Sequence, residues 1–220
     1  MNGASGTYRL YHYWRSSSSW RVRFGLSLKG IPYEPVAISL LDGSSESTEH
    51  LERNPAGSVP VLEIPGMVPR RLTESLAILQ YLEDLHPGTT SFLPPDPYLK
   101  ARCWALAETV NAGIQPIQNL PVLHRHSDDP GEQRNWARHF IRKGLEVYES
   151  LCAPIRGRFS VGDHPSLADL CLAPQLYNAD RYQVDWSDLG NLVGIEQACR
   201  ALPAWTESHP DRFKPADFHG

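Results

Sequence analysis

Residues 8–29 read YRLYHYWRSSSSWRVRFGLSLK and carry the signals that decide the fold. The segment 8–13 alternates along its length as a half-buried strand does. From residue 20 to residue 29, apolar side chains recur four positions apart, which is typical of a helix. Four serines, residues 16–19, lie between the two patterns. The stretch therefore predicts a strand followed by a helix with a serine-rich N-terminus.

The rest of the first third continues in short alternating elements. Residues 32–38 predict a second strand, and the polar segment 43–53 predicts a loop with a short helix. Residues 59–64 and 67–71 flank Pro65-Gly66, which indicates a hairpin. Leucines at 72, 76, 79, 82 and 85 then mark one apolar helix face. The predicted order is βαβ(α)ββα.

The pattern changes near residue 90. Residues 86–97 contain four prolines and little periodicity, so we place an inter-domain linker at 88–96, between domains at 1–87 and 97–220. Beyond it the sequence predicts helices only, the first with Pro116 in its middle, which should kink or divide it. These helices are expected near 97–126, 131–153, 166–179, 189–201 and 203–208, and Ser166 to Asp169 resembles a capping box. The fold class is a small α/β domain followed by an all-α domain.

Composition excludes several classes of protein. The chain has 220 residues and a formal charge of −4 without a basic run, so nucleic acid and anionic membrane surfaces are not expected partners. It has no apolar stretch of membrane-spanning length and no secretory leader pattern, and we expect a cytoplasmic protein. Its four cysteines form no CxxC pair and are expected to be buried, reduced thiols. His124 and His126 are two positions apart, on different helix faces, so no metal site is predicted.

Three features suggest a peptide ligand. Several serine hydroxyls at a helix N-terminus stabilise an anion such as a thiolate, which here has to come from a ligand because the segment holds no cysteine. A serine nucleophile is less favoured, since there is no GxSxG elbow. If the Val59-Pro60 bond is cis, the backbone of Val59 can face a peptide. Residues 73–75 give a second helix N-terminus, suited to a carboxylate. Together they fit a small peptide with a carboxylate at one end and a thiol at the other.

Over nearly its whole length the sequence resembles zeta-class glutathione transferases, the maleylacetoacetate isomerase family. The segment 15–23 is similar to the family signature RSSCSWRVR, and further matches follow in order along the chain. They are Asn54-Pro55 to Val59-Pro60, residues 74–83, 111–120, 161–163, 167–175 and 178–185.

The resemblance implies a thioredoxin-like N-terminal domain that binds glutathione, an all-α C-terminal domain that completes the substrate pocket, and a homodimer. By this resemblance Ser16 holds the glutathione thiolate, with Ser17 and Ser18 beside it in the catalytic segment. Val59, before a cis Pro60, pairs with the cysteinyl backbone. Ser75 binds the γ-glutamyl carboxylate, and Glu74 lies near the γ-glutamyl amino group.

The resemblance also assigns the substrate. Arg15 and Arg181 match arginines that grip the carboxylates of a dicarboxylic substrate, as a planar guanidinium can do in bidentate fashion. Gln115 and Asn119 match polar positions of the same pocket and are expected on one helix face. Ser18 departs from the family, which has a cysteine there. The glutamine that precedes Asn54-Pro55 in the family also has no clear counterpart in 43–53.

The implied activity is glutathione-dependent cis–trans isomerisation of maleylacetoacetate, or of maleylpyruvate, in aromatic catabolism, including that of tyrosine and phenylalanine. Two alternatives stay open, and Ser18 makes the second of them plausible. One is a glutathione transferase or glutathione-dependent dehalogenase acting on small electrophiles or α-halo acids, and the other is a non-catalytic glutathione-binding module.

Overall fold

The computed structural model describes residues 6–66, 68, 70–216 and 218, and the chain forms two compact units. The first unit comprises residues 1–91 and 203–220, and the second comprises residues 92–202. The chain passes from the first unit to the second between residues 91 and 92, which lies inside the predicted linker at 88–96. The segment 203–220 differs from the prediction, which assigned it to the helical domain.

The first unit has the predicted element order. Its elements are β1 (Tyr8–His12), α1 (Ser17–Lys29), β2 (Tyr33–Ala37), a 3-10 turn η1 (Ser44–Glu46), α2 (Thr48–Arg53), β3 (Val61–Ile64), β4 (Arg70–Thr73) and α3 (Ser75–Leu85). The prediction that Leu72 belongs to the apolar face of the helix is wrong, because Leu72 lies in β4 and α3 begins at Ser75. The predicted hairpin is present as β3 and β4, while Met67 and Pro69 of its turn lie outside the described residues.

The four strands form one mixed sheet in the order β2-β1-β3-β4. β1 runs parallel to β2 and antiparallel to β3, and β3 runs antiparallel to β4. Tyr11 pairs with Val61, and Val61 pairs with Thr73, so these three residues form one row across the sheet. The segments that leave this row therefore meet at the same end of the sheet.

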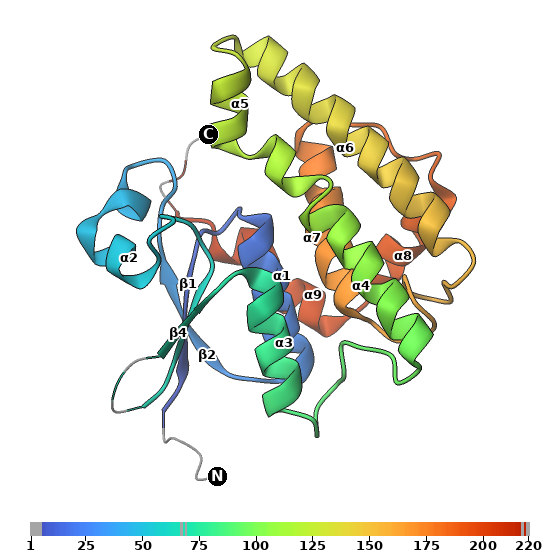
Figure 1. The fold of residues 1–220 in the computed structure, drawn as a ribbon, viewed down its shortest axis with the longest axis horizontal. Helices are drawn as coiled ribbons and strands as arrows, with labels where there is room; N and C mark the ends of the chain where they lie inside the picture. The colour runs from blue at the N-terminus through green and yellow to red at the C-terminus, as the bar shows by residue number, and fades with distance from the viewer. Residues whose placement is uncertain (1–5, 67, 69, 217, 219–220) are drawn as a thin grey trace. The chain divides into compact units, whose positions relative to one another are not determined.

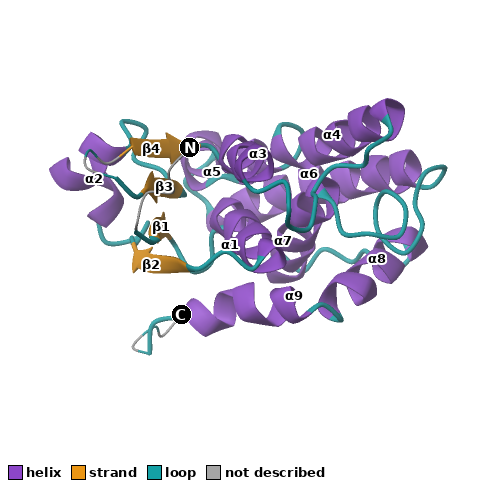
Figure 2. Ribbon diagram, turned by 90° about the horizontal axis from the view of Figure 1, so that it is seen from below, coloured by secondary structure: helices purple, strands orange, loops and turns teal. Residues whose placement is uncertain are grey.

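The two longer helices of this unit cover one face of the sheet, and α2 lies on the other side (Figures 1 and 2). The reason is the apolar stripe on each helix, which has to be buried against the sheet. Strand residues Leu10 and Leu62 pack with Val22 and Leu26 of α1 and with residues of α3. This cluster forms the core of the first unit.

A buried lysine holds the C-terminal ends of α1 and α3 together. The Lys29 ammonium pairs with Glu83 at 2.8 Å and donates to the carbonyl of Thr90 at 2.9 Å and to Thr89 Oγ1 at 3.1 Å. A buried charge is tolerated when it is paired and hydrogen-bonded, as it is here. The segment after α3 is thereby attached to the first unit.

The C-terminal segment joins the first unit because its side chains pack on α1. It contains α9 (Pro203–Ser208) and a 3-10 turn, η3 (Pro210–Phe213). The Trp205 and Trp20 rings meet edge to face, with centroids 4.9 Å apart, and the Trp20 indole donates to Ser208 Oγ at 3.0 Å. The sequence pattern predicts a helix at 203–208, as observed, but it carries no signal for the packing of this helix on α1.

Arg23 of α1 connects this segment to the loop that follows β1. The side chain is fully buried and donates to the carbonyls of Ser208 and Trp14, each at 3.0 Å. Arg23 Nη1 also donates to the carbonyl of Tyr13 at a longer distance, 3.4 Å, and the same nitrogen lies 3.1 Å from His12 Nδ1. Burial, with the Arg23 charge as a second cause, lowers the pKa of His12 to about 3. His12 is therefore neutral near pH 7 and can accept from Arg23.

The second unit is helical throughout its described elements. They are α4 (Pro97–Asn111), a 3-10 turn η2 (Gln115–Gln118), α5 (Leu120–His126), α6 (Pro130–Cys152), α7 (Leu167–Arg181) and α8 (Gly190–Arg200). The prediction that Pro116 kinks or divides the first helix is confirmed, since α4 ends at Asn111 and η2 follows. The His126 ring packs on Trp136, with centroids 4.1 Å apart, as part of the α5–α6 contact.

Helix α7 is the buried centre of this unit and packs against α4, α6 and α8. The predicted capping box at its start is confirmed. The buried Asp169 carboxylate accepts from the backbone N–H and the hydroxyl of Ser166, each at 2.8 Å, and from the backbone N–H of Ser160 at 2.8 Å. Asp169 thus fixes both the helix end and the loop before it.

All four cysteines, at positions 103, 152, 171 and 199, are free and buried, which confirms the interpretation of them as reduced core residues. Burial raises the pKa of Cys103 to about 11 and that of Cys152 to about 12, so these thiols stay protonated near neutral pH. Among the described residues, no helix is both long enough and apolar enough to cross a bilayer.

Replacing Asp169 should destabilise the protein far more than replacing an exposed helix cap. Asp169→Ala removes three accepted hydrogen bonds and leaves buried donors unpaired, and we expect a loss of about 3 kcal/mol. Asp129→Ala is the matched control, because Asp129 caps α6 from an exposed position and its removal should cost about 1 kcal/mol. Urea unfolding measures both free energies, and equal losses would contradict the role of Asp169.

The low pKa of His12 should make stability depend on pH. The unfolded chain binds a proton on this histidine below about pH 6.5, whereas the folded chain binds it only below about pH 3. The contribution of neutral His12 to the free energy of unfolding is therefore fully present above about pH 6.5. It is lost as the pH falls toward 3, by up to about 1.4 kcal/mol per pH unit. His12→Asn keeps an acceptor for Arg23 without a titrating group. Urea unfolding between pH 4 and 7 should give a shallower slope for this variant, and an unchanged slope would contradict the assignment.

Candidate functional site

The predicted ligand-binding residues of the first unit lie at one end of its sheet. Tyr11, Val61 and Thr73 form one row across β1, β3 and β4. The loop after β1 leads to Ser16, the residues before β3 include Val59, and the residue after β4 is Glu74, followed by Ser75. Strand register alone therefore brings together segments that lie far apart in the sequence.

Ser16 is the N-cap of α1. Its backbone is extended, with φ −69° and ψ 122°, and its Oγ accepts from the backbone N–H of Ser19 at 3.2 Å. A hydroxyl that accepts this bond still has its own proton to donate. The first turn of α1 has no acidic residue, so the positive end of the helix dipole is not offset locally. The arrangement stabilises an anion, including a thiolate, beside Ser16.

The remaining serines of the cluster differ in exposure. Ser17 is buried, Ser18 is half-buried, and both make contacts within the chain. Ser19 is fully buried, and its hydroxyl has no hydrogen-bond partner among the described residues. Ser16 therefore supplies the cap, while Ser17 and Ser18 are hydroxyls beyond what capping requires.

Val59 presents a free backbone at this end of the sheet. The Val59–Pro60 peptide bond is cis. Among the residues that the structure describes, no hydrogen bond involves the N–H or C=O of Val59. The carbonyl of Ser58 next to it is held by Asn54 Nδ2 at 2.9 Å and by His50 Nε2 at 3.1 Å. The backbone before β3 is thus fixed at Ser58, while the N–H and C=O of Val59 remain unused and could pair with a peptide.

Ser75 begins α3 and rests on an arginine that sequence reasoning missed. Arg21 of α1 is fully buried and donates to Ser75 Oγ at 3.2 Å, which leaves the Ser75 proton free to bind a carboxylate. Glu74 is exposed and has a positive φ of 64°. Arg21 stands inside the signature segment, so its charge was visible, but its contact with α3 required the fold.

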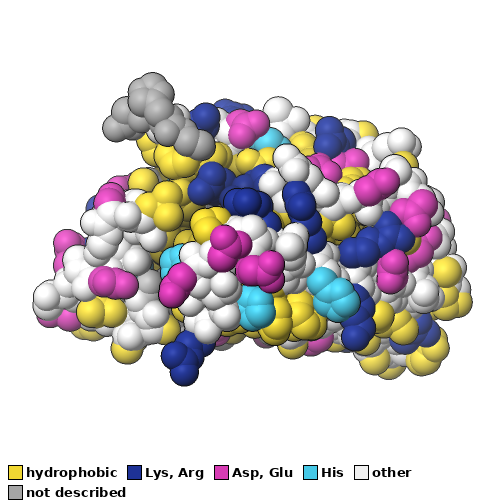
Figure 3. All heavy atoms as spheres, turned by 90° about the horizontal axis from the view of Figure 1, so that it is seen from above, with side chains coloured by type: hydrophobic (Ala, Val, Ile, Leu, Met, Phe, Trp, Pro, Cys, Tyr) yellow, Lys and Arg dark blue, Asp and Glu magenta, His cyan; other side chains and the backbone are white. Residues whose placement is uncertain are grey.

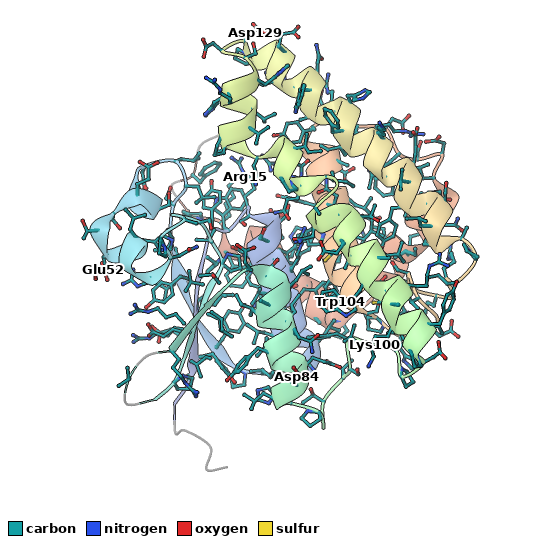
Figure 4. All side chains as sticks on the ribbon, in the orientation of Figure 1. Arg15, Glu52, Asp84, Lys100, Trp104 and Asp129 are labelled. Atoms are coloured by element: carbon teal, nitrogen blue, oxygen red, sulfur yellow. The ribbon has the colours of Figure 1, made fainter. Side chains whose placement is uncertain are left out.

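Arg15 precedes the cap of α1, at whose N-terminal end it is labelled in Figure 4. Its guanidinium carbon lies 5.3 Å from the ring centre of Trp14 and 5.3 Å from that of Phe218. Among the described residues, no carboxylate pairs with Arg15. A guanidinium held by its faces keeps its edge donors available for a carboxylate.

The other predicted substrate residues belong to the second unit. Gln115 begins η2, and Asn119 follows it with extended backbone before α5. The expectation that these two share one helix face is therefore wrong, because Pro116 produces a 3-10 turn in place of an α-helix. Arg181 is exposed near the end of α7 and donates to Asn178 Oδ1 at 2.7 Å.

Charged side chains are mixed on the surface shown in Figure 3. Lys and Arg side chains gather in a small group there, with acidic, histidine and apolar side chains around them. Among the described residues, no cluster of three or more His, Cys, Asp or Glu side chains is arranged to hold a metal ion.

Comparison with known proteins identifies the family. The family described as "Glutathione S-transferase, N-terminal domain" matches residues 10–90, and "Glutathione S-transferase, C-terminal domain" matches residues 133–208. The chain is 44% identical to the maleylacetoacetate isomerase of Rhizobium meliloti, with 94% of this chain and 97% of the relative covered. It is 42% identical to that of Rattus norvegicus, with 92% of each covered.

Solved structures that are similar to this chain belong to the same family. A maleylacetoacetate isomerase from Anaeromyxobacter dehalogenans, with glutathione bound in its active site, is 48% identical and has a TM-score of 0.87 over 96% of this chain and 97% of that one. A maleylpyruvate isomerase described as a bacterial zeta-class glutathione transferase is 35% identical, with a TM-score of 0.88 over 96% of this chain and 100% of that one. The predicted fold class is confirmed, and the chain belongs to the maleylacetoacetate isomerase family of zeta-class glutathione transferases.

Proposed function

We propose that this protein is a glutathione-dependent cis–trans isomerase that acts on maleylacetoacetate or maleylpyruvate. The observation that carries the proposal is the placement of Ser16, Val59 and Ser75 at one end of one sheet, each with an unused hydrogen-bonding group. Glutathione has a thiol, a peptide backbone and a terminal carboxylate in the corresponding order. The relatives named above support the same activity.

The residues fit each part of glutathione. The hydroxyl of Ser75, supported by Arg21, binds the γ-glutamyl carboxylate, and Glu74 lies near its ammonium. The N–H and C=O of Val59 pair with the cysteinyl backbone. Ser16 donates to the sulfur, with Ser17 and Ser18 next to it in the first turn of α1.

When bound, glutathione supplies a thiolate that adds to the cis double bond and leaves again after rotation about the resulting single bond. The chain's own residues keep the sulfur anionic, through Ser16 and the α1 dipole, and stabilise the negative charge that develops on the substrate. We assign this second task to Arg15 and, from the second unit, to Arg181 with Gln115 and Asn119. Glutathione is regenerated and is not consumed.

Ser18 favours a second candidate function. The family has a cysteine at this position, and serine provides a similar shape and a donor but no thiol chemistry. A transferase or dehalogenase that conjugates glutathione to small electrophiles or α-halo acids needs the same thiolate. A homodimer and a cytoplasmic location are further proposals that rest on the family resemblance.

Turnover of maleylacetoacetate and maleylpyruvate, with and without glutathione, tests the function. We expect isomerisation only when glutathione is present and no fall in its concentration over many turnovers. A stoichiometric loss of glutathione would identify the transferase. If bound glutathione gives no thiolate absorbance at neutral pH and no turnover, the protein is a binding module.

Ser16→Ala should separate thiolate activation from glutathione binding. Removing one preorganised donor to a developing or bound anion typically lowers turnover roughly 10²-fold. We expect kcat to fall by about that factor and the Kd for glutathione to change less than about threefold, since Ser75 and Val59 remain. Titration of thiolate absorbance should show a higher pKa for the bound thiol.

Asp96→Ala is the control for this experiment, because Asp96 caps α4 in the same way, accepting from Leu99 N–H at 2.8 Å. It should lower stability by about 1 kcal/mol and leave the thiol pKa unchanged. Equal losses of kcat and glutathione affinity in Ser16→Ala would contradict the assigned role.

A further inference from the structure

The C-terminal segment of the first unit extends beyond η3 to the loop that carries Arg15. Phe213 stacks under the Arg23 guanidinium, with 4.7 Å from its carbon to the ring centre. Phe218 then packs with Tyr13, Trp14 and Val59 in one apolar cluster. The segment is therefore fixed by Arg23 before it reaches the cluster next to Ser16.

Two aromatic rings in this cluster hold Arg15 between them. The rings of Trp14 and Phe218 meet edge to face, with centroids 5.0 Å apart and an interplanar angle of 71°. Arg15 lies 5.3 Å from both ring centres, within the range of cation–π attraction. The Lys214 ammonium approaches the same two rings, at 5.9 Å from Trp14 and 5.5 Å from Phe218.

Ring packing is what orients Trp14. Its indole nitrogen is buried and has no hydrogen-bond partner among the described residues, so no polar bond fixes the ring. Phe218 and Tyr13 are its aromatic neighbours. Loss of the Phe218 ring would therefore remove one of the two aromatic neighbours of Trp14 and one of the two rings that hold Arg15.

We propose that Phe218 is a positioning residue that orients Arg15 toward a carboxylate of the substrate, which makes the C-terminal segment a determinant of specificity for dicarboxylic substrates. This inference rests on the proposed function, because Arg15 is assigned there to the substrate. Within the described part of the chain, neither Arg15 nor Lys214 has an acidic partner. Two like charges on one pair of rings repel each other, and a bound carboxylate relieves that repulsion.

The test compares a charged substrate with an uncharged one in three variants of Phe218. Phe218→Ala should raise KM for the dicarboxylic substrate about two- to fivefold, the value of an exposed cation–π contact. The KM for glutathione, and kcat/KM for conjugation of an uncharged aromatic electrophile, should stay at their wild-type values. Phe218→Leu keeps an apolar side chain without a π face and should behave like Phe218→Ala, whereas Phe218→Tyr should restore the wild-type KM.

Tyr98→Ala provides the matched control. Tyr98 is exposed in the second unit, and its ring lies 5.8 Å from the guanidinium carbon of Arg102, so this variant removes an aromatic ring from another arginine. It should leave every kinetic constant unchanged. The melting temperature of each variant shows that the fold is intact.

The proposal is overturned if Phe218→Ala raises KM for charged and uncharged substrates alike, since the ring would then shape the pocket without orienting Arg15. It is also overturned if Phe218→Leu behaves like the wild type, or if KM for glutathione rises, which would place the carboxylate contact on glutathione. A wild-type protein without isomerase activity would instead refute the proposed function. The two failures are therefore distinguishable.

Discussion

The buried guanidinium of Arg23 is the interaction on which the organisation of the first unit depends. It places a full positive charge where water cannot reach, and such a charge is stable only when its donors are used. The acceptors are backbone carbonyls of Tyr13, Trp14 and Ser208, together with neutral His12. Because carbonyls carry only partial charge, the Arg23 guanidinium, called here the Arg23 fork, keeps its net positive charge. It holds together the loop after β1 and the C-terminal segment. These bonds fix the backbone of the loop that leads to Arg15 and Ser16.

The site also shows how an acidic protein binds an anionic tripeptide. The formal charge of −4 opposes such a ligand at long range. At short range the balance changes, because buried Arg21, Arg23 and the first turn of α1 all contribute positive potential and no acidic residue occupies that turn. Glu74 is the exception, and its place beside Ser75 suits a ligand that carries an ammonium next to its carboxylate.

Much of the fold followed from sequence because local and global signals agreed. Alternation in residues 8–13, the break at Pro116 and the cap at Ser166 are signals that act over a few residues, so the sequence predicts these features correctly. The helix N-terminus predicted at residues 73–75 is where α3 begins, whereas Leu72 continues the leucine spacing although it belongs to β4. The contacts of Arg21 with Ser75 and of Trp20 with Ser208 join chain segments that are far apart in the sequence and meet only in the folded unit. Such contacts have no periodicity that a single sequence can reveal.

The return of residues 203–218 to the first unit has a consequence for how this protein can be divided. A chain that stops at residue 91 would contain every strand of the sheet, yet it would lack Trp205, Ser208 and Phe213. Trp20 would then face water, and the Arg23 fork would lose one of its carbonyls. The sheet of the first unit is thus built from one continuous stretch of sequence, whereas its core also needs residues from the C-terminal segment. The N-terminal and C-terminal parts of the sequence belong to one compact unit.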